Sequence, residues 1–126
     1  MEAKLIVFFA AFCLLCICHR GCASECSLSS IVVVQYGTAD WAHGQPVYTV
    51  NVTNKCRCAQ SNIKLFCGGF ETTLEPDIAK LRRPLDGGEL CLLNDGKPVV
   101  QGQNVTFSYA WSKPFGFRPV SSRVAC

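Results

Sequence analysis

The stretch KCRCAQSNIKLFCGGF, residues 55–70, constrains how the rest of the chain can fold, because it holds three cysteines within twelve residues. Cys56 and Cys58 are two positions apart, so in an extended strand both side chains point to the same face. That geometry does not favour a bond between them, and we expect each to tie this segment to a different part of the chain. Alternate positions up to Cys67 are apolar, which predicts a strand, and Gly68-Gly69 ends it.

The start of the chain has the three-part layout of a secretory signal peptide. A short segment with one lysine precedes an unbroken apolar run at residues 5–18, and small residues around Ala23 suit a cleavage site. An uncleaved membrane anchor is the alternative, but a spanning helix needs roughly 20 apolar residues. We therefore expect a signal peptide at residues 1–23 and a single cysteine-rich domain at residues 24–126. The mature protein is then expected in the extracellular space, without stable membrane insertion.

Cleavage after Ala23 would remove four of the ten cysteines. An even number remains, which in a secreted chain predicts three disulfides among Cys26, Cys56, Cys58, Cys67, Cys91 and Cys126. Sequence alone does not choose among the possible pairings. A zinc site is the competing use of clustered cysteines, but the Cys-x-Cys spacing is tight and His43 is the only mature histidine. We expect no metal and no cofactor.

The charge of the mature chain is nearly balanced. The full chain has 12 basic and 9 acidic residues, and loss of Glu2, Lys4 and Arg20 leaves a net charge of +2. This balance argues against nucleic acid or an anionic membrane as the main partner.

Short β-rich segments separated by turn residues predict an all-β domain. The expected fold is a compact antiparallel sandwich, or a partly open barrel, of about seven short strands stapled by disulfides. The strands are expected at residues 30–36, 47–53, 63–67, 89–93, 98–100, 104–111 and 120–126. The run Ile31–Val34 is apolar at every position, which indicates burial on both faces or an exposed apolar patch.

Two Asn-x-Thr sequons, at Asn51 and Asn104, are candidate N-glycosylation sites in a secreted protein. Each asparagine falls on the polar face of its expected strand, which is the accessible side. We expect a glycan at one or both positions, with an unmodified surface asparagine as the alternative.

No residue pattern indicates catalysis. His43 lies in an expected loop with Asp40 nearby, and the sequence has no Gly-x-Ser-x-Gly motif. We therefore expect the protein not to be an enzyme.

Three residues are candidates for partner binding. Arg82 and Arg83 form the sharpest local charge and suit carboxylates on a partner, although a solvated basic turn is the alternative. Trp41 is expected in a loop, where a large aromatic surface favours recognition. Trp111 shares a face with Val105, Phe107 and Tyr109, so we expect it in the core.

The whole expected mature domain resembles the plant tapetum determinant family of small secreted cysteine-rich proteins. The resemblance rests on the order of the six cysteines and on two motifs, Cys67-Gly68-Gly69-Phe70 and Cys91-Leu92-x-Asn94-Asp95-Gly96-x-Pro98. Further matching segments are Pro46-x-Tyr48-x-Val50, residues 82–85 and Phe107-Ser108-Tyr109-Ala110.

This resemblance implies a secreted ligand that binds the ectodomain of a leucine-rich-repeat receptor kinase. In the best-known role of the family, the signal specifies the tapetum cell layer of the anther, a decision on cell fate in reproductive tissue. The extracellular compartment would then be the apoplast. A secreted cell-wall or carbohydrate-binding module is the alternative function, since exposed aromatic rings such as Trp41 can stack on sugars.

Overall fold

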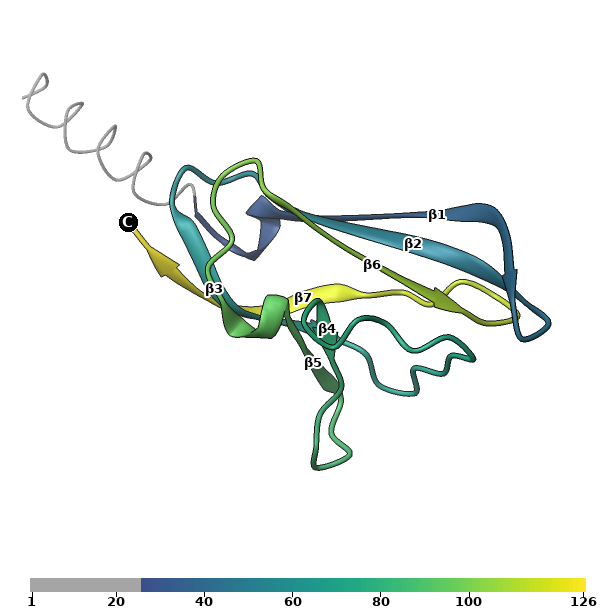
Figure 1. Cartoon of the computed structure of the whole chain (residues 1–126). Coiled ribbons are helices and arrows are strands. Elements are labelled where there is room, and N and C mark those ends of the chain that lie inside the picture. The colour runs from purple at the N-terminus through teal and green to yellow at the C-terminus, as the bar shows by residue number, and fades with distance from the viewer. Residues whose placement is uncertain (1–25) are drawn as a thin grey trace, which may run out of the picture.

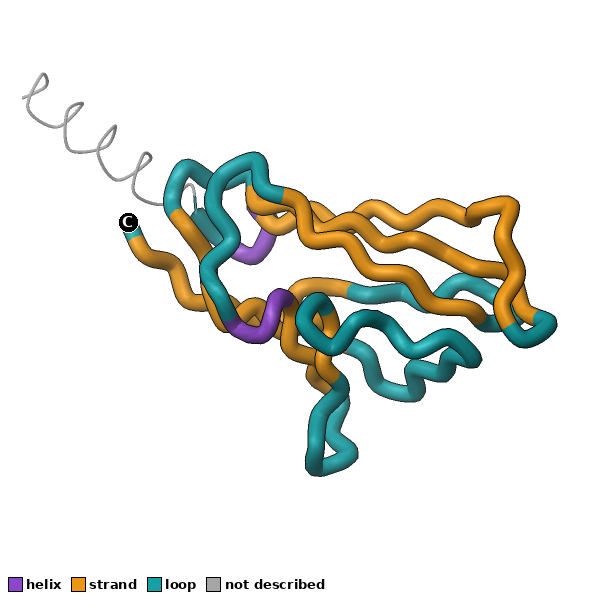
Figure 2. The backbone as a smooth tube through the Cα atoms, viewed as in Figure 1, coloured by secondary structure: helices purple, strands orange, loops and turns teal. Residues whose placement is uncertain are grey.

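The computed structural model describes residues 26–126 as two packed antiparallel sheets (Figure 1). The signal peptide expected at residues 1–23 lies outside this range. Within the described residues, no helix is long and apolar enough to cross a membrane. The backbone trace shows that nearly all regular structure is strand, with two short 3-10 turns (Figure 2). The expected all-β class is confirmed, and the sheets are open, so the fold is a sandwich and not a barrel.

Seven strands and two 3-10 turns make up the domain. In chain order they are η1 (Leu28–Ser30), β1 (Ile31–Ala42), β2 (Gln45–Asn54), β3 (Ala59–Phe66), β4 (Leu81–Arg82), β5 (Leu90–Leu93), η2 (Asn94–Gly96), β6 (Asn104–Ala110) and β7 (Arg118–Ala125). One sheet has the order β1-β2-β6 and the other has the order β4-β5-β3-β7. All strand pairs are antiparallel.

Alternating side chains fill the space between the sheets. In β6, Val105, Phe107 and Tyr109 are almost fully buried, as their period of two predicts. Trp111 follows the strand and packs partly buried against the same core. The inner positions of β2 and β3 complete this layer with Val50, Val52, Ile63 and Leu65. Burial of these side chains is the main favourable contribution to folding.

Strand β1 is longer than the sequence predicts. The expected loop between the strands at residues 30–36 and 47–53 is wrong, because β1 continues to Ala42 and β2 begins at Gln45. Only His43 and Gly44 connect them, with φ angles of 50° and 79°. Two-residue hairpin turns require this left-handed backbone, which the Gly supplies without steric cost. The register shifts between Gly37 and Trp41, so an irregularity interrupts the pairing.

The expected strand at residues 98–100 is also wrong. Asn94–Gly96 form the short 3-10 turn η2, which follows β5 but does not join it to a paired strand. Val99 instead makes an isolated bridge to Gln60 of β3. The strand that the sequence did not predict is β4, which consists of Leu81 and Arg82 and pairs with β5.

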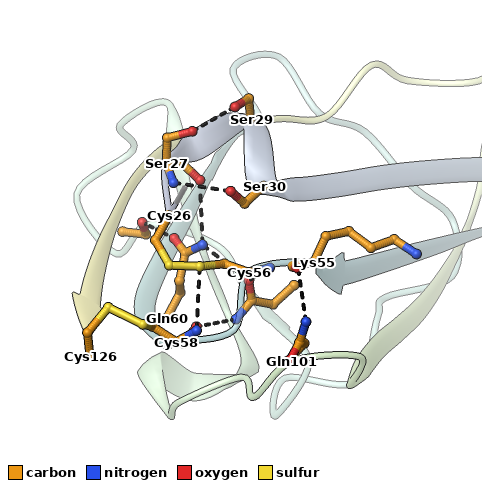
Figure 3. The surroundings of a disulfide bond; sticks show 12 residues. Cys26, Ser27, Ser29, Ser30, Lys55, Cys56, Cys58, Gln60, Gln101 and Cys126 are labelled. Carbon is orange, nitrogen blue, oxygen red and sulfur yellow. Dashed lines mark hydrogen bonds between the residues drawn. A yellow bond between two sulfur atoms is a disulfide. The ribbon is translucent and has the colours of Figure 1, made fainter. Parts of the chain in front are cut away.

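Three disulfides join the six cysteines of the described chain: Cys26–Cys56, Cys58–Cys126 and Cys67–Cys91. Cys56 and Cys58 bind different partners, as expected, although both lie in a bend before β3 and not in a strand. Figure 3 shows the first two disulfides side by side at one end of the sandwich. They attach the segments before β1 and after β7 to the same bend.

A buried polar network supports this bend. Asn54 and Gln60 are fully buried. The Asn54 amide donates to the carbonyls of Cys58 (2.9 Å) and Val99 (2.8 Å). Its Oδ1 accepts from the Cys56 backbone N–H (3.0 Å) and from the Gln60 amide (3.2 Å). Because buried polar groups are costly when unpaired, these four bonds allow an irregular backbone inside the domain.

Replacement of Asn54 with aspartate should destabilise the domain by at least about 3 kcal/mol, because the new oxygen would face two buried carbonyls. Asn104→Asp is the matched control. Asn104 is exposed and its Oδ1 accepts from Thr53, so that change should cost under about 0.5 kcal/mol. Chemical denaturation of unglycosylated protein measures both values. Equal stability of the two variants would show that the buried network does not hold the bend.

Candidate interaction site

The connection between β4 and β5, residues 83–89, projects away from both sheets (Figure 1). Leu85 is 97% exposed, more than any other large apolar side chain in the described chain. Two open grooves, of about 530 and 340 Å3, lie along this connection, and both are lined by Arg82, Arg83, Pro84 and Leu85. The segment 82–85 is therefore a ridge between two hollows, with an apolar side chain at its crest.

Arg83 fixes the base of this loop to the core. Its guanidinium lies 4.6 Å from the centre of the Phe70 ring. One terminal nitrogen donates to the Phe70 carbonyl (2.9 Å), and the other pairs with Glu75 (3.3 Å). A planar cation that stacks and donates at once suits arginine and not lysine. Arg83 thus holds the loop from inside while its crest stays in solvent.

Phe70 is the centre of an aromatic cluster under the loop. Edge-to-face contacts at 5.1–5.5 Å join it to Tyr109, Phe115 and Phe117. This arrangement places ring edges against ring faces, which is the favoured aromatic geometry. The Cys67–Cys91 disulfide belongs to the same core and links the end of β3 to β5. The base of the loop is therefore held by a covalent link as well as by packing.

The Tyr109 hydroxyl sits in a polar pocket of this cluster. It donates to the Gln35 side chain and accepts from the Phe115 backbone N–H (2.6 Å). Burial raises the pKa of the Tyr109 phenol above its usual value, so the hydroxyl stays protonated as a donor at neutral pH. The Gln35 amide returns a hydrogen bond to the Phe115 carbonyl (2.8 Å). This closed set of bonds anchors the segment after β6 across the sandwich to β1.

Arg82 has different surroundings from Arg83. It lies in β4 with its side chain 37% exposed and pairs with Asp95 at 3.2 Å. The larger groove also contains Lys64, Asp86 and Glu89, so charges of both signs line it. The sequence predicted that Arg82 and Arg83 would bind carboxylates on a partner, with a solvated basic turn as the alternative. The structure pairs each arginine with a carboxylate, and the two side chains are equally exposed, at 37% and 38%. They differ in their contacts, because Arg83 also stacks on Phe70 and donates to its carbonyl.

Trp41 lies at the far end of β1, beside the β1–β2 turn, and it is 70% exposed. The expectation that it sits in a loop is wrong, although its exposure was anticipated. Trp41 lines neither of the two grooves. Leu85, in contrast, was not singled out from the sequence, because nothing in the local pattern distinguishes an exposed leucine from a core one.

The two sequon asparagines lie in neighbouring strands, Asn51 in β2 and Asn104 in β6. Both are on the outer face of the β1-β2-β6 sheet, opposite the buried positions of the same strands. This face is distinct from the loop at residues 83–89, which projects from the other side of the molecule (Figure 1).

Among the described residues, one group of side chains is close enough to share a metal ion. The sulfurs of Cys26, Cys58 and Cys126 lie within 4.8 Å of one another. All three are in disulfides, and a metal ligand must be a thiolate. His43 sits in the β1–β2 turn and is exposed. The cysteine cluster therefore serves as a pair of covalent crosslinks. The surface suited to an apolar contact is the projecting loop, through Leu85.

The profile of the tapetum determinant 1 C-terminal family matches residues 27–126, which is the entire domain apart from its first cysteine. The chain belongs to the tapetum determinant family. The TPD1 protein homolog 1A of Oryza sativa subsp. japonica is 35% identical over 103 residues, covering 75% of this chain and 43% of that protein. The TPD1 protein homolog 1 of Arabidopsis thaliana is 37% identical over 101 residues, covering 77% and 55%.

An uncharacterized protein of Arabidopsis thaliana is 32% identical over 100 residues, covering 78% of this chain and 76% of that protein. The chain spans about half the length of the two named tapetum determinant relatives that it matches. No solved structure matches the chain.

Replacement of Arg83 with alanine should lower the free energy of unfolding by about 2 kcal/mol, because it removes the stacking on Phe70 and the bond to its carbonyl. Arg82→Ala is the control in the same segment. Its ion pair with Asp95 is exposed, so its loss should cost under about 0.5 kcal/mol. Thermal or chemical denaturation separates the two. Similar stability of both variants would contradict the anchoring role of Arg83.

Proposed function

We propose that this member of the tapetum determinant family is a secreted signalling protein. It acts without catalysis, as a ligand for the ectodomain of a leucine-rich-repeat receptor kinase that controls cell fate in reproductive tissue. Family membership supports this proposal, because secreted receptor ligands are what the resemblance implies. The three disulfides agree with it, since crosslinked domains of this size are typical of extracellular proteins.

The observation that carries the proposal is the projecting loop with Leu85 at its crest. A signalling ligand needs an accessible contact that keeps its shape before binding, because ordering a flexible loop on binding costs affinity. Here the apolar side chain is almost fully exposed, while Arg83 and the Cys67–Cys91 disulfide hold the base. Burial of an exposed leucine in a partner pocket contributes roughly 2 kcal/mol.

Arg82 supplies a second contact of a different kind. Its guanidinium is accessible beside the ridge and suits a carboxylate on the receptor. A pair at the rim of an interface would chiefly speed association and would weaken at high salt. Leu85 would then set the lifetime of the complex, and Arg82 would set the rate at which it forms.

The second candidate function is a cell-wall or carbohydrate-binding module. The observation in its favour is Trp41, a residue that is 70% exposed near the end of β1, away from the crosslinks. In that case Trp41→Ala would abolish retention on wall polysaccharides, and substitutions in the loop would have no effect.

Leu85→Asp should weaken binding to the cognate receptor ectodomain by at least about tenfold, because a charge cannot enter the pocket that accepts leucine. Val100→Asp is the matched control, since Val100 is 54% exposed and lines neither groove. Surface-based kinetics against a panel of leucine-rich-repeat ectodomains provides the measurement. The Arg82→Ala variant should show slower association at low salt and little change at high salt.

Unchanged kinetics for Leu85→Asp on an ectodomain that binds the native protein would contradict the loop as the contact. Absence of binding to the whole panel, together with retention on wall polysaccharides, would favour the carbohydrate-binding alternative.

A further inference from the structure

The outer face of the β1-β2-β6 sheet has a regular composition. The strand register places three rows of side chains across it: Val32, Thr53 and Asn104; then Val34, Asn51 and Thr106; then Tyr36, Thr49 and Ser108. The edge strand β1 thus contributes an apolar column, and β2 and β6 contribute polar columns. Val34 and Tyr36 are 53% and 55% exposed. Asn51 lies at the centre of this face.

The two sequons lie opposite each other in this register. The hydroxyl of Thr106, from the second sequon, donates to Asn51 Oδ1 at 3.1 Å. The hydroxyl of Thr53, from the first sequon, donates to Asn104 Oδ1 at 2.6 Å. Each sequon threonine therefore orients the asparagine of the other sequon. Both amide oxygens are engaged, while neither Nδ2 has a hydrogen-bond partner among the described residues.

We propose that Asn51 and Asn104 both carry N-linked glycans, and that the glycan on Asn51 covers the apolar column of β1. The free Nδ2 atoms are the ones that bear sugar, so the cross-strand bonds persist in the glycosylated protein. In the attachment step, Nδ2 attacks the anomeric carbon of a lipid-diphosphate-linked oligosaccharide. The new C–N bond replaces the C–O bond to the diphosphate, which leaves with the electron pair, and Nδ2 loses one proton.

The register determines where each glycan lies. Asn104 is near the start of β6, an edge strand, so its glycan can extend beyond the sheet. Asn51 is in the central strand and a diagonal neighbour of Asn104, about 7–8 Å away in such a pair. The Asn104 glycan occupies the space over β6. The Asn51 glycan therefore extends over β1, on the other side of β2. There Val34 is directly opposite, and Tyr36 is on the diagonal.

The chemistry of this column suits a sugar. The flat faces of pyranose rings carry C–H groups that pack on aliphatic and aromatic side chains, and their rims present hydroxyls to water. Val34 and Tyr36 offer such a surface beside Asn51, without a charged residue among the nine positions of the face. An exposed apolar edge strand is prone to pair with another chain, and a glycan across it would block this association.

The test uses the full chain secreted from a eukaryotic cell line. Amidase removal of N-glycans converts each occupied asparagine to aspartate, and peptide mass spectrometry locates both conversions. We expect conversion at Asn51 and at Asn104. Thr53→Ser and Thr106→Ser are control variants that keep both the sequon and the hydroxyl, and both sites should stay occupied in them. Absence of a glycan at Asn51 or at Asn104 in the native sequence would overturn the proposal.

The rate of Tyr36 nitration measures how far the Asn51 glycan shields the outer face of β1 from solvent. In Asn104→Gln protein, which keeps only the Asn51 glycan, nitration of Tyr36 should rise several-fold after enzymatic deglycosylation. In Asn51→Gln protein, the same treatment should leave Tyr36 unchanged. Tyr109 is fully buried and serves as the internal reference. If a variant is not secreted, the native protein before and after deglycosylation gives the reading. Equal nitration of Tyr36 with and without glycan would overturn the proposed cover.

Discussion

The double crosslink at the bend of residues 56–58 is the constraint on which the rest of the structure depends. Cys56 and Cys58 bind Cys26 and Cys126, so both ends of the described chain meet at one corner. The sequence separations of 30 and 68 residues correspond to about 3–4.5 kcal/mol each in the chain-entropy description. The backbone of residues 56–58 is irregular and lacks the hydrogen bonds of a strand. The buried Asn54 and Gln60 side chains supply hydrogen bonds in their place.

This constraint divides the molecule into surfaces of different character. The corner of residues 56–58 is closed by two disulfides, and the outer face of the β1-β2-β6 sheet carries the two sequons. The loop at residues 83–89 is held only at its base, by Arg83 and by the Cys67–Cys91 disulfide, and it presents Leu85 to solvent. Glycans on one face and an apolar crest on another would leave a protein partner one clear approach. This division of surfaces supports the proposed signalling role.

The alternation of apolar and polar residues along the sequence predicted those strands whose inner and outer faces differ in composition. The alternation in β6 and the strand before Cys67 followed from side-chain periodicity. The separate partners of Cys56 and Cys58 were also predicted, although these residues lie in a bend and not in the strand that the prediction assumed. The full length of β1 was not predicted, because Gly37 and Pro46 are residues typical of loops. Only the pairing of β1 with β2 around the His43-Gly44 turn shows that both strands continue through this region. The anchoring of Arg83 was also beyond the sequence, since Phe70 and Glu75 meet it only in the folded chain. Each sequon was visible alone, but their pairing depends on the strand register.

The disulfide pairing of the secreted protein tests this account most directly, and Arg57 makes it measurable. Trypsin cleavage after Arg57, without reduction and with free thiols blocked, separates Cys56 from Cys58. The account predicts that the dipeptide Cys56-Arg57 is linked to the peptide that contains Cys26, and that the peptide of residues 58–64 is linked to residues 124–126. A peptide pair that joins Cys56 directly to Cys58, or blocked free thiols at either position, would contradict it.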